Sequence, residues 1–116
     1  MYHILVVDDE DNIRQLIKKY ANFEGYKVTE AADGMEALDI CAQCSFDLII
    51  MDVMMPELDG FSTLRQLRRK DRRTPVLMLS ARGEEYDRIH GFELGVDDYV
   101  VKPFSPKELM LRAAAI

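Results

Sequence analysis

Four short segments place side chains that could do chemistry directly after apolar runs of the sequence. The first run is followed by Asp8 and Asp9, and another is followed by Asp52. Two further runs are followed by Ser80 and Lys102. Carboxylates, a hydroxyl and an ammonium group that converge could hold a hard divalent cation and a phosphoryl group, because both need oxygen contacts and neutralising charge.

Five apolar runs are expected to form the strands that position these groups. The runs are His3–Val7, Tyr26–Glu30, Phe46–Met51, Pro75–Leu79 and Asp97–Val101. Four are nearly continuous in apolar residues, which is typical of parallel strands covered on both faces, whereas residues 26–30 are more polar and are expected at an edge. Amphipathic segments alternate with the runs. This alternation predicts an α/β fold with an open, doubly wound parallel sheet and helices on both faces.

The predicted helices rest on apolar spacing and on end signals. A first stripe at helical spacing is formed by Ile13, Leu16, Ile17, Tyr20 and Phe23. A second helix is expected over Gly34–Cys44, a third is marked by Phe61, Leu64 and Leu67, and a fourth by Ile89, Phe92 and the nearby Leu94. Gly25 and Gly95 are expected to close the first and fourth helices. Ser105-Pro106 begins the last helix, with Glu108 placed as in a capping box.

Size and charge narrow the class of protein. A length of 116 residues suits one domain, and the net charge of −6 disfavours direct nucleic-acid binding by this chain. No apolar run has the length of about 20 residues that spans a bilayer. The N-terminal residues carry no signal for secretion, so a cytoplasmic location is expected.

Cys41 and Cys44 form a Cys-x-x-Cys pair. That spacing suits a redox pair or half of a zinc site, but His3 and His90 stand apart and no second cysteine pair completes four ligands. The favoured interpretation is two buried or half-buried thiols in a reducing compartment.

Each chemical group also has a simpler explanation. The acidic residues after the first run could favour a helix N-terminus, Asp52 could form a turn, Ser80 could cap a helix, and Lys102 could be an ordinary surface residue. In doubly wound sheets, however, ligands bind beyond the carboxyl ends of the strands. All four groups follow such ends, so their combination favours a functional site.

Four motifs resemble, in order and spacing, the CheY-like receiver domains of response regulators. They are Val6-Val7-Asp8-Asp9-Glu10, Asp52-Val53-Met54-Met55-Pro56-Glu57-Leu58-Asp59-Gly60, Leu79-Ser80-Ala81 and Val101-Lys102-Pro103-Phe104. The resemblance covers essentially the whole chain. It implies a single receiver domain over residues 1–116, a flavodoxin-like sheet with strand order 2-1-3-4-5, and phosphorylation by a sensor histidine kinase.

The resemblance also implies a role for each residue. Asp52 would accept the phosphoryl group, and Mg²⁺ or Mn²⁺ would be held by Asp8, Asp9, Asp52 and the backbone carbonyl of Met54. Lys102 would pair with a phosphate oxygen, and Ser80 would donate its hydroxyl to the phosphoryl group. Tyr99 would turn inward as the switch responds, and the Lys102-Pro103 peptide would be cis. Such a domain catalyses its own phosphorylation and dephosphorylation but is a signalling domain and not an enzyme in the usual sense.

The stretch that follows Ser80 resembles the OmpR/PhoB branch of this family. That resemblance implies a weak homodimer through the fourth helix, fifth strand and fifth helix, and transcriptional control through a DNA-binding domain that residues 1–116 do not contain. The charged residues of the dimer face would be Arg88 with Glu108, Asp98 with Arg112, and Asp97 with a basic partner not supplied here. A stand-alone receiver that acts on a protein target is the alternative.

Three other functions compete with this interpretation. A phosphohydrolase of the haloacid-dehalogenase type would need a second carboxylate two residues after Asp52, where this chain has Met54. A flavodoxin-like electron carrier would need a phosphate-binding loop in place of the acidic residues 8–11. A receiver that only binds partners would not need Asp52, Ser80 and Lys102 together.

Overall fold

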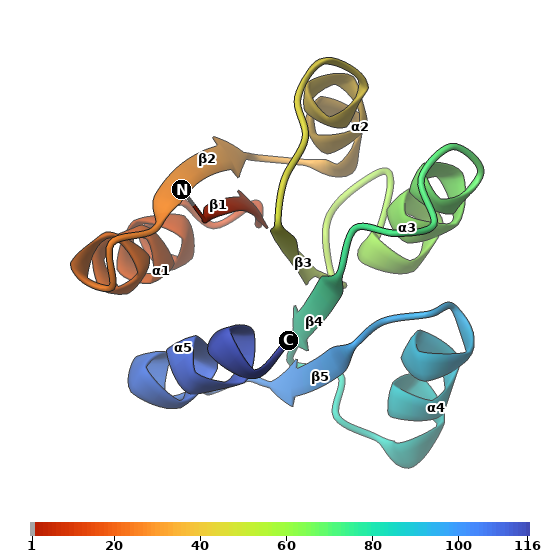
Figure 1. Ribbon diagram of the computed structural model, residues 1–116. Coiled ribbons are helices and arrows are strands. Elements are labelled where there is room, and N and C mark those ends of the chain that lie inside the picture. The colour runs from red at the N-terminus through yellow and green to blue at the C-terminus, as the bar shows by residue number, and fades with distance from the viewer. Residues whose placement is uncertain (1) are drawn as a thin grey trace.

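The computed structural model describes residues 2–116, which form a five-stranded parallel sheet covered on both faces (Figure 1). The strands are β1 (His3–Val7), β2 (Lys27–Ala31), β3 (Leu48–Asp52), β4 (Val76–Ser80) and β5 (Asp98–Val101). The helices are α1 (Asp11–Phe23), α2 (Gly34–Gln43), α3 (Gly60–Arg68), α4 (Glu85–Glu93) and α5 (Pro106–Ala115). The strand order is β2-β1-β3-β4-β5. The predicted fold class and strand order are confirmed.

Two apolar cores lie on opposite faces of the sheet. On one face, α1 and α5 pack against the strands through Ile17, Ala21, Leu109 and other residues. On the other face, α2 and α3 contribute Ala37 and Leu64 to a core in which Tyr99 of β5 also takes part. Figure 1 shows α1 and α5 together on one side of the strands and α2, α3 and α4 on the other. Every residue of β3 and β4 is buried, which explains why these strands are almost continuously apolar.

The strand predictions are right in number and place but differ in their bounds. β2 is the partly exposed edge strand that its polarity predicted. β5 begins at Asp98 rather than Asp97, and the Asp97 carboxylate accepts a hydrogen bond of 3.0 Å from the amide of Val76 at the start of β4. The closing glycines are confirmed, since Gly25 and Gly95 have φ values of 85° and 94°.

The apolar stripe predicted for α1 is only partly buried. Ile17 is fully buried, whereas Tyr20 is 38% and Phe23 89% exposed. The helix buries a narrower face than its sequence spacing suggested, because the small residue Ala21 lies against the sheet one turn after Ile17. Phe23 therefore lies on the surface.

Of the three apolar residues that marked α4, Leu94 packs against the core, but the prediction is wrong for the other two. Ile89 and Phe92 are each about half exposed, and the buried residues of the helix are Asp87 and Gly91. A Cβ atom on Gly91 would lie 3.0 Å from the ring of Tyr99. The helix therefore approaches β5 through a residue without a side chain, which leaves its larger apolar groups toward solvent.

The remaining end signals have mixed outcomes. Ser105 accepts a hydrogen bond of 3.1 Å from the amide of Glu108, as predicted for the start of α5. α2 ends at Gln43, one residue before the predicted end at Cys44. Cys41 within the helix is half-buried but Cys44 after it is exposed, so the prediction of two buried or half-buried thiols holds only for Cys41. No helix within residues 2–116 is both long enough and apolar enough to cross a membrane.

Candidate functional site

The carboxyl ends of four parallel strands meet at one edge of the sheet. Asp8 directly follows β1, Asp52 and Ser80 are the last residues of β3 and β4, and Lys102 directly follows β5. β1 lies between β2 and β3, so the chain reverses its direction of winding at the β1–β3 boundary. The site lies where the rule for doubly wound sheets places a ligand.

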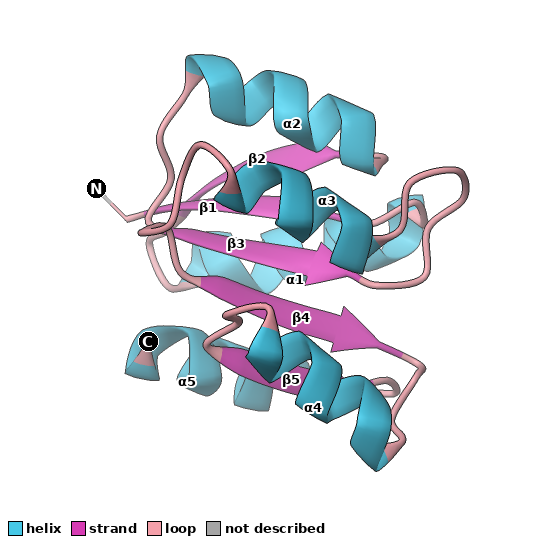
Figure 2. Ribbon diagram, turned by 90° about the vertical axis from the view of Figure 1, so that its right-hand side faces the viewer, coloured by secondary structure: helices cyan, strands magenta, loops and turns pink. Residues whose placement is uncertain are grey.

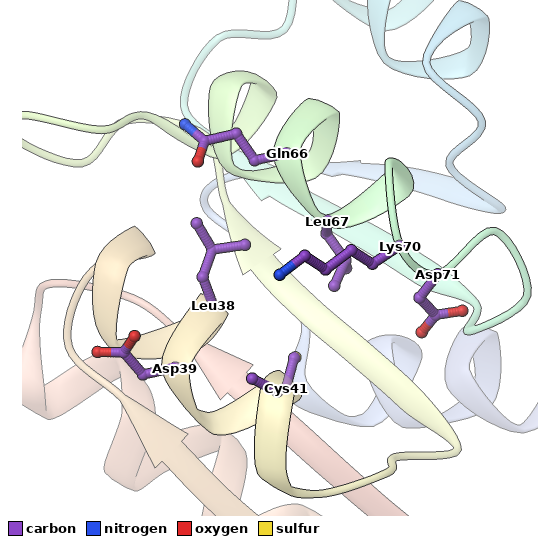
Figure 3. A pocket seen from close by; sticks show the side chains of 8 residues that line it. Leu38, Asp39, Cys41, Gln66, Leu67, Lys70 and Asp71 are labelled. Atoms are coloured by element: carbon purple, nitrogen blue, oxygen red, sulfur yellow. The ribbon is translucent and has the colours of Figure 1, made fainter.

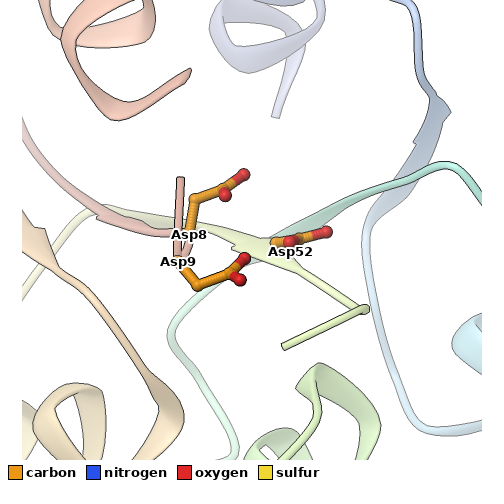
Figure 4. Close-up of side chains that lie close together, drawn as sticks. All are labelled: Asp8, Asp9 and Asp52. Atoms are coloured by element: carbon orange, nitrogen blue, oxygen red, sulfur yellow. The ribbon is translucent and has the colours of Figure 1, made fainter. Parts of the chain in front are cut away.

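Three carboxylates converge at this edge. One oxygen from each of Asp8, Asp9 and Asp52 lies within 4.8 Å of the others, and Figure 4 shows the three side chains pointing toward a common space. Asp8 and Asp52 are buried, with 1% and 3% of their surfaces exposed, whereas Asp9 is exposed. Two buried negative charges this close repel each other and are poorly hydrated.

The acidic loop after β1 is held by hydrogen bonds from within the chain. The Asp8 carboxylate accepts a bond of 2.9 Å from the amide of Glu10, and its backbone carbonyl accepts one of 2.7 Å from Arg14. Arg14 also contacts Glu30 on β2 at 3.2 Å. Arg14 was not identified from the sequence, because a single arginine on a helix gives no sign that it fixes a backbone.

Lys102 is the cation within this cluster. Its Nζ lies 3.1 Å from Asp8, 3.5 Å from Asp52 and 3.7 Å from Glu10. Burial by itself would lower the pKa of Lys102, but the attraction of Asp52 and the other carboxylates outweighs burial, and the pKa is raised. Lys102 therefore stays protonated. The Lys102-Pro103 peptide bond is cis, as the resemblance implied.

One ammonium group does not neutralise the buried carboxylates. Burial, followed by the negative charge of Asp8, raises the pKa of Asp52 to about 7. Burial also raises the pKa of Asp8. Lys102 and the amide of Met54, which lies 3.3 Å from the Asp52 carboxylate, lower the pKa of Asp52, but they do not offset the effects of burial and of Asp8.

The chemistry of these groups fits a divalent cation. A hollow of about 270 Å³ opens beside Asp9, Asp52, Met54 and Lys102, and its oxygen groups are those that Mg²⁺ prefers. Such an ion would compensate the excess negative charge that Lys102 leaves. Gly60, the first residue of α3, lets the chain pass close to the backbone of Asp52. A Cβ atom at this position would lie 2.3 Å from the Asp52 carbonyl oxygen.

Ser80 and Tyr99 are linked to each other through the backbone of one residue, Arg82. The hydroxyl oxygen of Ser80, which is fully buried, accepts a bond of 3.0 Å from the amide of Arg82. The hydroxyl of Tyr99 donates a hydrogen bond of 2.6 Å to the carbonyl oxygen of Arg82. Tyr99 is only 6% exposed, so its ring already lies inward in this structure.

The Arg82 side chain reaches α4. Its guanidinium lies 2.8 Å from a carboxylate oxygen of Asp87, which is 3% exposed. The same guanidinium lies 5.8 Å from the centre of the Phe61 ring. Asp87 was missed at the sequence level because its position in a charged, amphipathic segment gave no sign of burial.

The charged residues predicted for a dimer face lie on or next to α4, β5 and α5, and several are bonded within the chain. The residues are Arg88, Asp97, Asp98, Glu108 and Arg112. Arg112 lies 3.0 Å from Asp98 and 3.5 Å from Glu108. The Asp97 carboxylate is bonded to the backbone of β4, and Arg88 donates to the backbone carbonyl of Gly83 in the loop before α4. Asp98, Glu108 and Arg112 are therefore in contact, whereas Arg88 lies on α4, on the face of the sheet opposite α5.

A second hollow, of about 510 Å³, lies between α2 and α3 (Figure 3). Leu38 and Cys41 line it from α2, and Leu67, Lys70 and Asp71 line it from α3 and the loop that follows. Burial raises the pKa of the Cys41 thiol to about 11, so this thiol is a poor nucleophile at neutral pH.

Comparison with known proteins agrees with this fold. The family model described as "Response regulator receiver domain" matches residues 4–114, and the chain belongs to this family. The transcriptional regulatory protein SrrA of Staphylococcus aureus (strain NCTC 8325 / PS 47) is 47% identical over 113 residues, which cover 97% of this chain and 46% of SrrA. The chain thus spans less than half the length of this relative.

Solved structures show the same architecture. The receiver domain of the Francisella response regulator 1452 superposes with a TM-score of 0.94 at 42% identity, covering 99% of this chain and 95% of that one. The chemotaxis protein CheY4 of Vibrio cholerae also gives a TM-score of 0.94, at 36% identity, and covers 100% of this chain and 98% of that one. The chain is a response regulator receiver domain in sequence and in fold.

Proposed function

We propose that Asp52 accepts a phosphoryl group from a sensor histidine kinase and that this modification switches the α4, β5 and α5 side of the domain. The observation that carries the proposal is the cluster in which Asp8, Asp9 and Asp52 converge, with Lys102 in contact with the buried Asp8 and Asp52. Phosphoryl transfer needs an aligned nucleophile and fixed positive charge more than covalent assistance. The cluster supplies both requirements.

Each residue has a separate task in this reaction. An oxygen of the ionised Asp52 carboxylate attacks the phosphorus atom, and the bond from phosphorus to the donor atom breaks. Lys102 compensates negative charge on the phosphoryl oxygens. Asp8, Asp9, Asp52 and the backbone carbonyl of Met54 would hold Mg²⁺ or Mn²⁺. The ion would neutralise charge on the phosphoryl oxygens and favour the ionised form of Asp52.

The switch follows from the hydrogen bonds of Ser80. A phosphoryl group on Asp52 would attract the Ser80 hydroxyl, which now accepts a bond from the amide of Arg82. Because Tyr99 bonds to the carbonyl of that same residue, a shift of the loop changes the packing of Tyr99 against Gly91 on α4. Phosphorylation would thereby bias the surface of α4, β5 and α5 toward a weak homodimer.

The relationship to SrrA, which is described as a transcriptional regulatory protein, supports a role in transcription. In this proposal residues 1–116 are one receiver domain, and DNA is recognised by another domain whose position dimerisation would set. The receiver would be a signalling component that catalyses its own modification and not a metabolic enzyme.

The deciding experiment is incubation with acetyl phosphate, with and without Mg²⁺, followed by intact-mass measurement. Wild type should gain one phosphoryl group only with the metal ion, and Asp52→Asn should gain none. The control is Asp39→Asn, which removes an exposed carboxylate on α2 and should react like wild type.

Two outcomes would contradict the proposal. The absence of an adduct on wild type, both with acetyl phosphate and with beryllofluoride, would leave only a binding domain. Rapid multiple turnover of assorted phosphomonoesters would indicate a hydrolase, although Met54 stands where such an enzyme would need its second carboxylate.

A further inference from the structure

The most basic segment of the chain lies at the end of α3 and in the loop that leads to β4. Residues 65–73 contain six of the 15 lysines and arginines and a single acidic residue, Asp71. The segment has a net charge of +5 in a chain of net charge −6, which leaves −11 on the remaining residues. The negative net charge of the whole chain disfavours nucleic-acid binding, but residues 65–73 form a local region of strong positive charge.

Five of these six cations are exposed and lack a carboxylate partner. They are Arg65, Arg69, Lys70, Arg72 and Arg73. None of them forms an ion pair with any residue from 2 to 116. The negative end of the α3 dipole explains a preference for basic residues in the last turn of the helix. It does not explain the cations that follow in the loop.

The sixth cation, Arg68, holds this segment in shape. Its guanidinium donates to the carbonyl oxygen of Thr74 at 2.8 Å and to that of Gly95 at 3.4 Å. The Asp71 carboxylate accepts bonds of 2.9 and 3.1 Å from the amides of Arg73 and Thr74. The exposed cations thus extend from an ordered loop, so a ligand that binds them does not also have to order the backbone.

The segment lies at the edge of the sheet opposite Asp52. Because α3 and α5 both run antiparallel to the strands, both helices end at the edge where the strands begin. Figure 2 shows the C-terminal end of α5 on this side, away from the strand tips. Lys70 extends over the hollow between α2 and α3 (Figure 3). Ligands of this surface would not obstruct the phosphorylation site.

We infer that residues 65–73 form a surface that binds the phosphate backbone of duplex DNA. No large hydrophobic side chain is exposed in the segment, whereas protein interfaces have an apolar centre and membrane-binding segments an apolar face. Protein–DNA interfaces are polar and positively charged. Four of the five free cations are arginines, whose planar guanidinium groups match phosphate oxygens in pairs.

This inference rests on the proposed role in transcription, since a DNA-recognising domain joined to the receiver would keep DNA close to it. Tethering raises the effective concentration of DNA, so even a weak contact would add to the affinity of the whole protein. Contacts to phosphate carry no sequence preference. The segment would therefore strengthen binding and would not select the target.

The test is a titration of the 116-residue chain with a labelled short DNA duplex, followed by fluorescence anisotropy at low and at near-physiological ionic strength. The patch variant Arg69→Gln/Arg72→Gln/Arg73→Gln is compared with the control Lys19→Gln/Lys27→Gln/Lys107→Gln, which loses the same charge from exposed residues elsewhere. The patch variant should bind at least about tenfold more weakly and show a flatter salt dependence, because each lost phosphate contact reduces that slope by about 0.9. The control should stay within about twofold of wild type.

Equal weakening of both variants would overturn the inference, because binding would then depend only on net charge. Absence of DNA binding by wild type at low salt would also overturn it, as would binding to phosphatidylserine vesicles without binding to DNA. Labelling of the wild type with acetyl phosphate separates the two proposals. Normal labelling of the wild type without DNA binding would reject the DNA surface alone, and DNA binding by the wild type without labelling would reject the phosphoacceptor function alone.

Discussion

Two arginine–aspartate pairs on the α4, β5 and α5 side of the domain differ in one property. Arg82 and Asp87 approach to 2.8 Å, and Arg112 and Asp98 to 3.0 Å. The two arginine side chains are 42% and 44% exposed, but the aspartates are 4% and 22% exposed. A buried carboxylate depends on its partner because water cannot replace it, whereas a partly exposed one can be solvated. The first pair should thus stabilise the fold, and the second is free to exchange partners.

The positions of the pairs match this division. The backbone of Arg82 bonds to Ser80 and Tyr99, so the buried pair anchors the loop that would report phosphorylation. Arg112 lies on α5 and contacts Asp98 and Glu108, two residues of the proposed dimer face. Arg82 and Asp87 thus hold the loop in place, whereas Arg112 and Asp98 could form ion pairs with a second subunit.

The largest effect on stability is expected from Arg82→Ala. The substitution leaves the buried Asp87 carboxylate without its cation and should lower the free energy of unfolding by about 3 kcal/mol. Urea denaturation measures the change. The double variant Arg82→Ala/Asp87→Asn should recover most of the loss, because no buried charge remains. A loss below about 1 kcal/mol in the single variant would show that Asp87 is solvated after all.

In metal-free buffer, Asp52→Asn should raise the free energy of unfolding, whereas Arg82→Ala lowers it. Burial raises the pKa of Asp52 to about 7, so the folded state holds its ionised form at a cost, and the neutral amide should stabilise the domain by about 2 kcal/mol. In wild type this contribution is favourable at low pH and is lost as pH rises from about 4 to about 7. Thermal unfolding across that range should show a steeper slope in wild type than in the variant, which keeps only the contribution of groups such as Asp8. Mg²⁺ should stabilise wild type more than Asp52→Asn.

The sequence was sufficient to predict which strand ends carry Asp52, Ser80 and Lys102. These residues could be located because each follows an apolar run, and parallel strands bring such ends together. The burial of Asp87 could not be predicted, since it depends on the close approach of α4 to Tyr99 through Gly91. The exposure of Phe23 could not be predicted either, because helical spacing gives the direction of an apolar face and not how much of that face the sheet covers.

Asp71 offers an intermediate case, a carboxylate held by hydrogen bonds instead of an ion pair. The Thr74 hydroxyl lowers its pKa from the ordinary value of 3.8, and the amides of Arg73 and Thr74 act in the same direction. Its contribution to stability is therefore present above about pH 4 and lost as pH falls through the folded-state pKa. Asp71→Asn should cost about 1 kcal/mol at neutral pH, measured by urea denaturation. Unchanged stability at neutral pH would show that these bonds are not needed.

The smallest effect on the monomer is expected from Arg112→Gln. Water can solvate Asp98 and Glu108 in place of the guanidinium, so the urea midpoint of the unphosphorylated domain should not change measurably. The association of the beryllofluoride-treated domain, followed by sedimentation velocity, should weaken. Glu108→Gln should weaken it as well, and Lys107→Gln on the same helix serves as the control.

The bonds that Arg112 already makes also predict how strong that dimer can be. Any contact between subunits that uses Arg112 must replace its bonds to Asp98 and Glu108, so the net gain from each exchanged pair is small. Much of the stabilisation would then have to come from the half-exposed apolar groups Ile89 and Phe92 on α4. Ile89→Ser should consequently weaken association more than Arg112→Gln does. The reverse order would show that exchanged ion pairs, and not apolar contact, stabilise the dimer.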